Sequence, residues 1–221
     1  SWTATLDYQI TPEFLLYATT RGSWRAGSYN PFAPPLGNAT AAGGGNYFLP
    51  ETVRDVEVGA KFNGRVGSLP IQVNVAGYNQ WIDDVQRTVY ILINGNVASF
   101  TSNVPKAKVT GFEADAQIRP ASWLTIGGSM SYNDARFTDG RAVLFGQQVN
   151  FGPYADTPRF SGSLYGQVSI PLENDKGVID LRADLYHQSS FYYSNLAATL
   201  TPGTQIPAYE LIHLRLDWAQ F

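Results

Sequence analysis

The sequence predicts an all-β fold, an antiparallel up-and-down meander of about nine strands. The first observation is a strict alternation of apolar and polar side chains, which indicates strands with two different faces. It is clearest in residues 112–119, where Phe112, Ala114, Ala116 and Ile118 alternate with Glu113, Asp115, Gln117 and Arg119. The second observation is that short and long connections between such runs take turns along the chain. No stretch of useful length has the apolar period of a helix.

Nine alternating runs are expected to form the strands. They cover residues 2–10, 14–24, 53–62, 71–93, 97–119, 124–133, 159–170, 178–188 and 209–218. Asn94-Gly95 is the strongest turn signal, because a type I′ hairpin needs positive φ values that these residues tolerate. Asn63-Gly64 is expected to begin another compact turn, which ends at Pro70. Consecutive runs joined in this way form antiparallel hairpins.

The connections are of two kinds. Residues 11–13, 63–70, 120–123 and 171–177 are short, whereas residues 25–51, 82–106, 134–157 and 189–208 make long excursions. In a meander, alternate connections lie at the same end of the sheet, so all short turns share one rim and all long loops share the other. Short turns at one rim and long loops at the opposite rim are typical of an outer-membrane β-barrel.

The composition narrows the class of protein. Of the 221 residues, 44% are hydrophobic and only 15% are charged, whereas about a quarter of a typical soluble domain is charged. The net charge of -3 argues against a nucleic-acid partner, because such proteins carry basic patches. The absence of cysteine excludes disulfides and cysteine-ligated metals. The chain opens within a strand and shows no signal peptide, so we expect a fragment of a longer protein.

The two faces of the strands differ in a way that suits a membrane barrel. Charged side chains run along one face of several strands, where we expect them to line a wet lumen and pair across strands. The expected lumen-facing residues are Glu57, Glu113, Asp115, Arg119, Arg182 and Asp184. The opposite face contains many alanine and glycine residues, and aromatic residues gather near strand ends, as at a bilayer interface. A soluble β-sheet protein also alternates, so it is the alternative fold.

Five segments carry a resemblance to a known family. They are residues 16–27 (LYATTRGSWRAG), 50–61 (PETVRDVEVGAK), 78–86 (YNQWIDDVQ), 108–113 (KVTGFE) and 124–137 (LTIGGSMSYNDARF). The first resembles the segment Y-A-S-x-S-x-G-F-R-x-G of TonB-dependent receptors, and the second resembles their segment P-E-x-V-x-N-Y-E-x-G-x-K. The segments cover nearly the whole chain in the order of that family, so the resemblance is more specific than any single motif.

The resemblance implies the C-terminal part of a 22-stranded outer-membrane barrel that imports scarce nutrients with energy delivered through TonB. Its implied partners are outer-membrane lipid, TonB acting through a plug domain, and a small-molecule or metal-chelate ligand such as a ferric siderophore. The plug and the remaining strands of the family are not among these residues, so we expect residues 1–221 to be one partial barrel domain. The implied location is the cell outer membrane. Residues 209–218 resemble a strand some way before the end of the family, so we expect Phe221 to be a truncation point.

Aromatic and amide side chains occur just beyond strand ends on the side of the long loops. They are Tyr29, Asn30 and Phe32 in one loop and Phe191, Tyr192 and Tyr193 in another. Such groups in the mouth of a barrel are candidates for contact with an incoming ligand. Packing of the loops against one another is the alternative role for the same residues.

The sequence contains no pattern that predicts an enzyme. Asp83 and Asp84 are neighbours on an expected strand, so they face opposite ways and do not form an acid–base pair. A G-x-S-x-G motif is absent, and the two histidines, His187 and His213, do not by themselves predict a metal site. We therefore expect no catalytic residue, no bound metal and no cofactor. The alternative to a transporter is a soluble all-β ligand-binding or surface-adhesion module.

Overall fold

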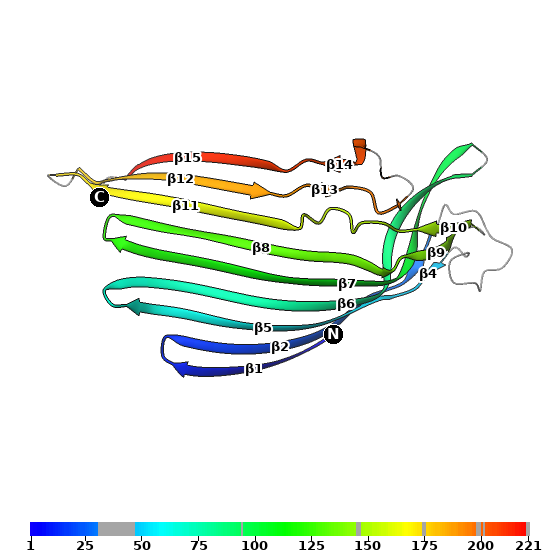
Figure 1. The fold of residues 1–221 in the computed structure, drawn as a ribbon, viewed down its shortest axis with the longest axis horizontal. Coiled ribbons are helices and arrows are strands. Elements are labelled where there is room, and N and C mark those ends of the chain that lie inside the picture. Colours follow the sequence, from blue (N-terminus) through cyan, green and yellow to red (C-terminus); the bar gives the residue numbers. More distant parts are fainter. Residues whose placement is uncertain are drawn as a thin grey trace.

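The structure is dominated by one antiparallel sheet of nine strands in the order β1-β2-β5-β6-β7-β8-β11-β12-β15. The computed structural model describes residues 1–30, 47–93, 95–144, 147–173, 176–197, 200 and 202–219. The nine strands are β1 (Trp2–Thr11), β2 (Phe14–Arg25), β5 (Glu51–Val66), β6 (Leu69–Ile93), β7 (Asn96–Ala121), β8 (Leu124–Asp139), β11 (Phe160–Pro171), β12 (Val178–Gln188) and β15 (Tyr209–Ala219) (Figure 1). The predicted meander of nine strands is confirmed.

The register turns the alternating sequence into two distinct faces. One row of cross-strand partners on the polar face contains Tyr17, Gly59, Ala76, Glu113, Ser131, Ser161 and Gln188. The adjacent row on the apolar face contains Ala18, Val58, Gly77, Phe112, Tyr132 and Phe160. A shift of one residue in any strand would exchange its two faces, so the pattern specifies the register strongly.

The turn between β5 and β6 differs from the expectation. Asn63-Gly64 does not begin it, because β5 continues to Val66 and pairs there with Leu69. The Asn63 N–H donates to the carbonyl of Glu13 at 2.9 Å, which holds this pair of residues in extended structure. Gly67, with φ of 63°, supplies the left-handed conformation that the turn requires. The contact with the preceding hairpin therefore places the turn at Gly67 and not at Gly64.

The long excursions contain strands of several kinds. Residues 82–106 form the continuation of β6 and β7, as the alternating runs 71–93 and 97–119 predicted, and this hairpin projects beyond the neighbouring strands and turns at Gly95 (Figure 1). Strand β8 runs six residues past its expected end at Asn133. Short two-stranded sheets occupy parts of the other long connections: β3 (Ser28–Tyr29) with β4 (Tyr47–Phe48), β9 (Arg141–Leu144) with β10 (Gln147–Asn150), and β13 (Phe191–Tyr192) with β14 (Gln205–Ile206). A 3₁₀ turn, η2 (Pro202–Thr204), precedes β14.

The buried apolar core lies at the end of the molecule that carries the long connections. Its buried members are Ile82, Val85, Val89, Phe100, Val104, Ala107 and Phe151. They come mainly from the extended β6–β7 hairpin, and Phe137 and Tyr154 pack against them. Over the rest of the sheet, the apolar face carries many exposed large side chains, such as Leu6, Val58 and Leu214. The hydrophobic surface of the strands is therefore not covered by any other described part of this chain.

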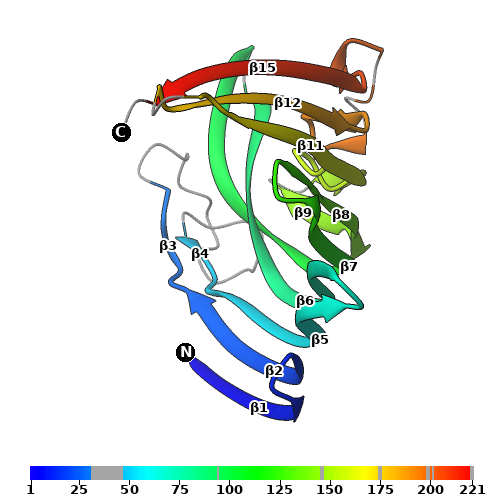
Figure 2. The same cartoon turned by 90° about the vertical axis from the view of Figure 1, so that its left-hand side faces the viewer.

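The sheet curves into an open arc (Figure 2). Strands β1 and β15 form its two edges, and each pairs with one neighbour only within the described residues. Short turns lie at one end of the arc and long connections at the other, as predicted (Figure 1). Among the described residues, the structure contains no helix long and apolar enough to cross a membrane.

Candidate functional site

The polar face of the sheet is its concave face. Figure 2 shows β3 and β4 on the inner side of the arc. Leu49, which directly follows β4, donates its N–H to the side-chain oxygen of Asn103 on the polar face of β7 at 2.7 Å. All six residues predicted to face a lumen share this face by register: Glu57, Glu113, Asp115, Arg119, Arg182 and Asp184.

One cluster of closely paired charges on the concave face lies between β2 and β5. The Arg21 guanidinium is 2.9 Å from the carboxylate of Asp55 and 2.6 Å from that of Glu57. The Tyr17 hydroxyl donates to Glu57 at 2.8 Å. The Asp55 side chain is only 9% exposed, so its charge depends on Arg21 for compensation. This cluster is a fixed arrangement of donors and acceptors rather than a set of freely solvated charges.

The other predicted concave residues differ in how closely they are paired. Asp115 accepts from the Asn74 amide at 2.8 Å, and Glu113 accepts from the Ser131 hydroxyl at 3.5 Å. Arg119 is exposed near the rim of short turns. The Arg182 guanidinium lies 2.6 Å from the carboxylate of Asp184 on the same strand. A polar, hydrated surface with paired charges along its length can guide a polar solute without holding it tightly.

Tyrosine rings lie over glycines at three places on the concave face. In each case the two residues are direct cross-strand partners, and a Cβ atom on the glycine would lie within 3 Å of the ring or hydroxyl. The pairs are Tyr17 with Gly59, Tyr78 with Gly111 and Tyr165 with Gly127. Sequence reasoning missed these pairs, because only the register shows which tyrosine faces which glycine.

The first group of predicted ligand contacts is divided by the structure. The Tyr29 side chain is 74% exposed, and its ring lies 6.2 Å from that of Tyr47. Asn30 is buried, and its side-chain amide donates to and accepts from the backbone of Thr101, both at 2.8 Å. Phe32 lies outside the described residues. Tyr29 is thus available to a solute, whereas the side chain of Asn30 already anchors its loop to β7.

The second group lies on a separate small sheet. Phe191 and Tyr192 pair with Ile206 and Gln205, and the Tyr192 carbonyl accepts from the Asp156 N–H at 2.8 Å. The Tyr193 N–H donates to the carbonyl of Thr204 at 3.1 Å, while its side chain is 53% exposed. The backbone of this segment is therefore held in place, and its ring at Tyr193 is presented outward.

Two amide side chains that sequence reasoning missed, buried Gln86 and half-buried Asn103, position the loop between β2 and β5. Gln86 donates from its side chain to the carbonyls of Ala26 and Leu49, at 2.9 and 3.0 Å. Asn103 donates to the carbonyls of Leu49 and Asp84, at 3.0 and 2.7 Å. These amides tie both ends of the described loop to the extended β6–β7 hairpin. The sequence did contain a signal for this role: Gln86 and Asn103 are amide residues within predicted strands, where apolar residues are more usual.

The histidines do not form a common site. The side chain of His187 points to the apolar face of β12, and that of His213 points to the polar face of β15, where it pairs with Asp184 in the register. Among the residues that the structure describes, no group of three or more His, Asp or Glu side chains is arranged to hold a metal ion.

Comparison with known proteins identifies the family. The family described as TonB dependent receptor-like, beta-barrel matches residues 1–220. The chain belongs to this family. No curated protein matches the sequence.

Solved structures of similar fold include uptake receptors for ferric chelates and a copper transporter. The ferric yersiniabactin uptake receptor FyuA of Yersinia pestis matches with a TM-score of 0.69 at 17% identity. The copper transporter OprC matches with a TM-score of 0.68 at 16% identity, and the ferric-catecholate import receptor Fiu of Escherichia coli K12 with 0.67 at 18% identity. This chain is covered to 98%, 96% and 99%, but it spans only 29%, 30% and 28% of those chains. At these identities the likeness shows the fold alone.

The convex face of this TonB-dependent receptor segment carries an apolar band with an oblique upper boundary. The first charged residue on that face, moving toward the long connections, is Arg54 on β5, Asp134 on β8 and Glu210 on β15. The row of cross-strand partners that contains Glu210 on β15 contains Ala60 on β5. The boundary on β5 is at Arg54, six residues nearer the long connections than Ala60, so the boundary is displaced along the strands by about six residues between β5 and β15. With 3.3 Å per residue and 4.8 Å between strands, this is a slope of roughly 35°, within the tilt of strands in outer-membrane barrels.

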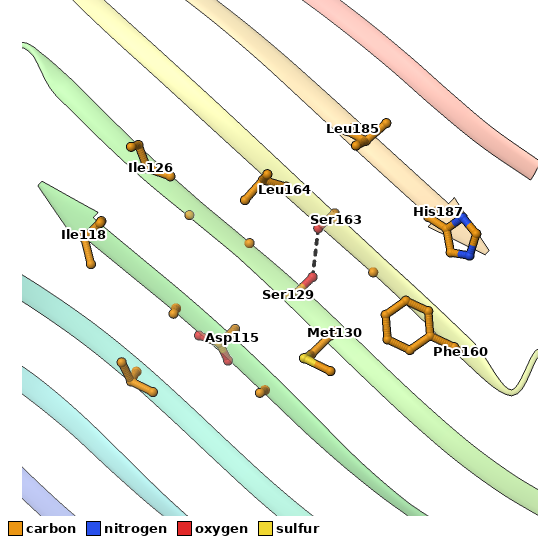
Figure 3. Close-up of a pocket in the computed structure, with 16 residues that line it drawn as sticks. Asp115, Ile118, Ile126, Ser129, Met130, Phe160, Ser163, Leu164, Leu185 and His187 are labelled. Atoms are coloured by element: carbon orange, nitrogen blue, oxygen red, sulfur yellow. Dashed lines mark hydrogen bonds between the residues drawn. The ribbon is translucent and has the colours of Figure 1, made fainter. Parts of the chain in front are cut away.

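A shallow groove of about 530 Å³ runs along the apolar band over β7, β8, β11 and β12 (Figure 3). Its sides are Ile118, Ile126, Met130, Phe160, Leu164 and Leu185. Small residues between these side chains, among them Gly128 and Gly162, form the bottom of the groove. The bond between the Ser129 and Ser163 hydroxyls, 2.9 Å long, belongs to the concave side of the same strands. The apolar side chains of the groove belong to the convex face, and its lining also includes Asp115, Ser129 and Ser163, which belong to the polar face by register.

Proposed function

We propose that this chain forms part of an outer-membrane transporter that imports a scarce nutrient, such as a ferric siderophore, with energy supplied through TonB. The observation that carries the proposal is the match of the TonB-dependent receptor barrel to residues 1–220. Solved structures of the same fold are receptors for ferric yersiniabactin, ferric preacinetobactin and ferric catecholates. Their chemistry supports a metal chelate as the ligand class of this chain.

The surface chemistry supports a location in the outer membrane. The apolar band follows the slope that a bilayer would cut across tilted strands, and an exposed face of this kind is stable only against lipid or protein. The concave face carries the Arg21–Asp55–Glu57 cluster and the Arg182–Asp184 pair, which suits a hydrated interior. We therefore assign the convex face to lipid and the concave face to the lumen.

The ligand path is assigned to the concave face and the long connections above it. The exposed rings of Tyr29 and Tyr193 are the first candidates for ligand contact, since their backbones are fixed and their rings are not buried. Asn30 serves as a structural anchor in this scheme, because both polar atoms of its side chain already bond to Thr101. Because the chain spans 28–30% of its structural neighbours, we propose that the plug domain and the rest of the barrel lie outside the 221 residues.

Uptake by the intact receptor tests this function. Cells that express the intact receptor as their one siderophore receptor are grown without free iron, and uptake of radiolabelled ferric siderophores is measured with and without TonB. We expect the receptor in the outer-membrane fraction and uptake that is lost when TonB is removed. Recovery of the intact protein in the soluble fraction would instead favour the soluble binding or adhesion module. Uptake of the same size without TonB would overturn the coupling.

A further inference from the structure

The convex face carries a basic patch just above the apolar band. The patch consists of Lys108 on β7, Arg136 on β8 and Arg159, which directly precedes β11, together with the carboxylate of Asp134 on β8. The guanidinium groups of Arg136 and Arg159 lie 2.9 and 3.2 Å from oxygens of that carboxylate. Lys108 is the direct cross-strand partner of Arg136. One negative charge therefore faces three positive charges, although the chain as a whole has a net charge of -3.

The cations of the basic patch are available to a ligand. The side chains of Arg136 and Arg159 are 59% and 67% exposed. Lys108 forms no ion pair with the residues that the structure describes. On the neighbouring strands β6 and β5, Asp83 and Arg54 neutralise each other at 3.6 Å. Lys106, exposed on the same face of β7 two residues beyond Lys108, adds a further positive charge and lies between Asp83 and Asp139 in the register.

The position of the basic patch relates it to the apolar groove. Phe112 and Tyr132 stack with their ring centres 5.8 Å apart, between the patch and the groove on the same strands. From Met130 in the groove to Arg136 in the patch, β8 rises by roughly 20 Å. Cations, aromatic rings and an apolar groove therefore follow one another along one face. A lipid leaflet has its phosphates, its interface and its acyl chains in the same order, so each group on this face lies at the depth of its lipid counterpart.

We propose that the basic patch binds the phosphate groups of a lipid in the outer leaflet, with an acyl chain of that lipid in the groove of β7, β8, β11 and β12. Guanidinium groups bind phosphate through paired, charge-assisted hydrogen bonds, which suits Arg136 and Arg159. Each basic side chain at a membrane surface strengthens attachment to anionic lipid by about five-fold. The inference rests on the proposed function, because it requires the apolar band to lie in the bilayer.

Lipid binding to the intact receptor in uncharged detergent tests the proposal. The probes are lipid A with two phosphates, the same lipid after removal of its phosphates, and phosphatidylethanolamine, with the bound lipids counted by native mass spectrometry. The test variant is Lys108→Gln with Arg136→Gln, which leaves Arg159 to neutralise Asp134. The matched control is Arg65→Gln with Arg119→Gln, which removes two positive charges from the concave face. The variant Ala116→Phe fills the groove without changing charge.

We expect wild-type receptor and the concave-face control to prefer phosphorylated lipid A, and the test variant to lose about 25-fold in its affinity for that lipid. The Ala116→Phe variant should also bind it more weakly. Equal binding of the phosphorylated and dephosphorylated lipids by wild type would overturn the proposal, even if the test variant failed to fold. Unchanged binding by Ala116→Phe would overturn the placement of the acyl chain. Failure of the proposed function itself is distinguished by recovery of the intact protein outside the outer membrane.

Discussion

At the scale of single residues, the concave face depends on close contacts between tyrosine and glycine. Tyr165 lies over Gly127, donates its hydroxyl to Gln117 at 2.7 Å and lies 3.8 Å from the guanidinium carbon of Arg182. A glycine in the middle of a strand weakens it, and an aromatic ring from the neighbouring strand restores the lost contact. Glycine is therefore needed at position 127 because the Tyr165 ring leaves no room for a Cβ atom, and not because of its backbone conformation.

We expect Gly127→Ala to destabilise the intact receptor by about 1–2 kcal/mol, because the new methyl group displaces the Tyr165 ring and its hydrogen bond. The reason is that the added Cβ would lie 2.7 Å from the Tyr165 hydroxyl. Gly166→Ala is the matched control, since nothing lies within 4 Å of a Cβ at that position. The free energy of unfolding, measured by urea titration of the receptor in lipid vesicles, checks this. Equal losses for both variants would show that the ring contact is unimportant.

Asp84 lies in the projecting β6–β7 hairpin, where burial, followed by repulsion from Asp83, raises the pKa of its carboxyl above the ordinary value. A carboxyl whose pKa is raised in the folded state does not oppose folding while it is protonated, but its charge destabilises the folded state as the pH rises above the ordinary pKa. Asp84→Asn should therefore raise the melting temperature of the intact receptor at pH 7, and the gain should vanish as the pH falls toward the ordinary pKa of aspartate. Asparagine also tolerates the φ of 55° at this position.

Asp83→Asn serves as the control for that experiment, because Asp83 is paired with Arg54 and its charge is compensated. It should give a smaller gain in melting temperature at pH 7 than Asp84→Asn, because it relieves only the repulsion, the lesser cause of the raised pKa of Asp84, and it also loses the ion pair with Arg54. A gain for Asp84→Asn that persisted unchanged at acidic pH would assign the effect to something other than the carboxylate charge.

The aromatic residues beside β13 allow a direct test of ligand contact. We expect the double change Tyr192→Ala and Tyr193→Ala to weaken binding and uptake of the ligand by roughly 10-fold or more, as loss of aromatic anchors does in binding sites. Phe191 is left unchanged so that its pairing with Ile206 between β13 and β14 is retained. Affinity of the intact receptor for ferric siderophores and their uptake are measured together. If both are unchanged, these rings serve only to pack the loops.

At the scale of elements, each strand separates two solvents. On β7, Glu113 faces the row of Ala76 and Ser131, whereas Ala114 faces the row of Val75 and Met130. One residue along the chain thus changes the environment from the polar face to the apolar band. This difference makes neighbouring positions a sensitive probe of the assignment to lumen and lipid.

We expect Ala114→Arg to lower insertion of the intact receptor strongly, because a lipid-facing arginine near the middle of the bilayer costs about 2–4 kcal/mol. Glu113→Gln should be tolerated, since it removes a charge that accepts only a 3.5 Å bond from Ser131. The amount of folded receptor in the outer membrane is measured from its resistance to unfolding in detergent on a gel. Similar yields for both variants would argue that β7 faces water on both sides, as in a soluble sheet.

At the scale of the whole molecule, nine strands form an arc with two open edges. The edge strands β1 and β15 each pair with one neighbour among the described residues. In hydrocarbon, each unpaired backbone group costs several kcal/mol, so an open sheet cannot span a bilayer. In water, the exposed apolar band and the open edges favour association.

We therefore expect residues 1–221, expressed alone, neither to transport a ligand nor to form a resistant monomer in lipid vesicles. The protein should sediment as an oligomer or aggregate, whereas the intact receptor should give a monomer that resists detergent. Sedimentation and uptake into vesicles check the two statements. Uptake by the isolated segment would refute the assignment of function to a closed barrel.

The sequence by itself determined the fold class, the strand order and the division into two faces. It did so because a strand alternates with a period of two, so residues such as Glu113 and Ala114 can be assigned to opposite faces without knowledge of their neighbours. The alternation of short and long connections likewise fixed which ends of the strands lie together. The resemblance to TonB-dependent receptors, seen in the same segments, agrees with the family match over residues 1–220.

Only the tertiary structure decided which residues of neighbouring strands meet. It placed the turn at Gly67 and not at Gly64, set Tyr165 over Gly127, and used the amide of Asn30 to hold a loop. It also brought Lys108 and Arg136 together from two strands with Arg159 from the connection before a third. These features depend on the register and on contacts between distant segments. A periodic pattern within one strand contains no information about either, because it repeats every two residues whatever lies beside it.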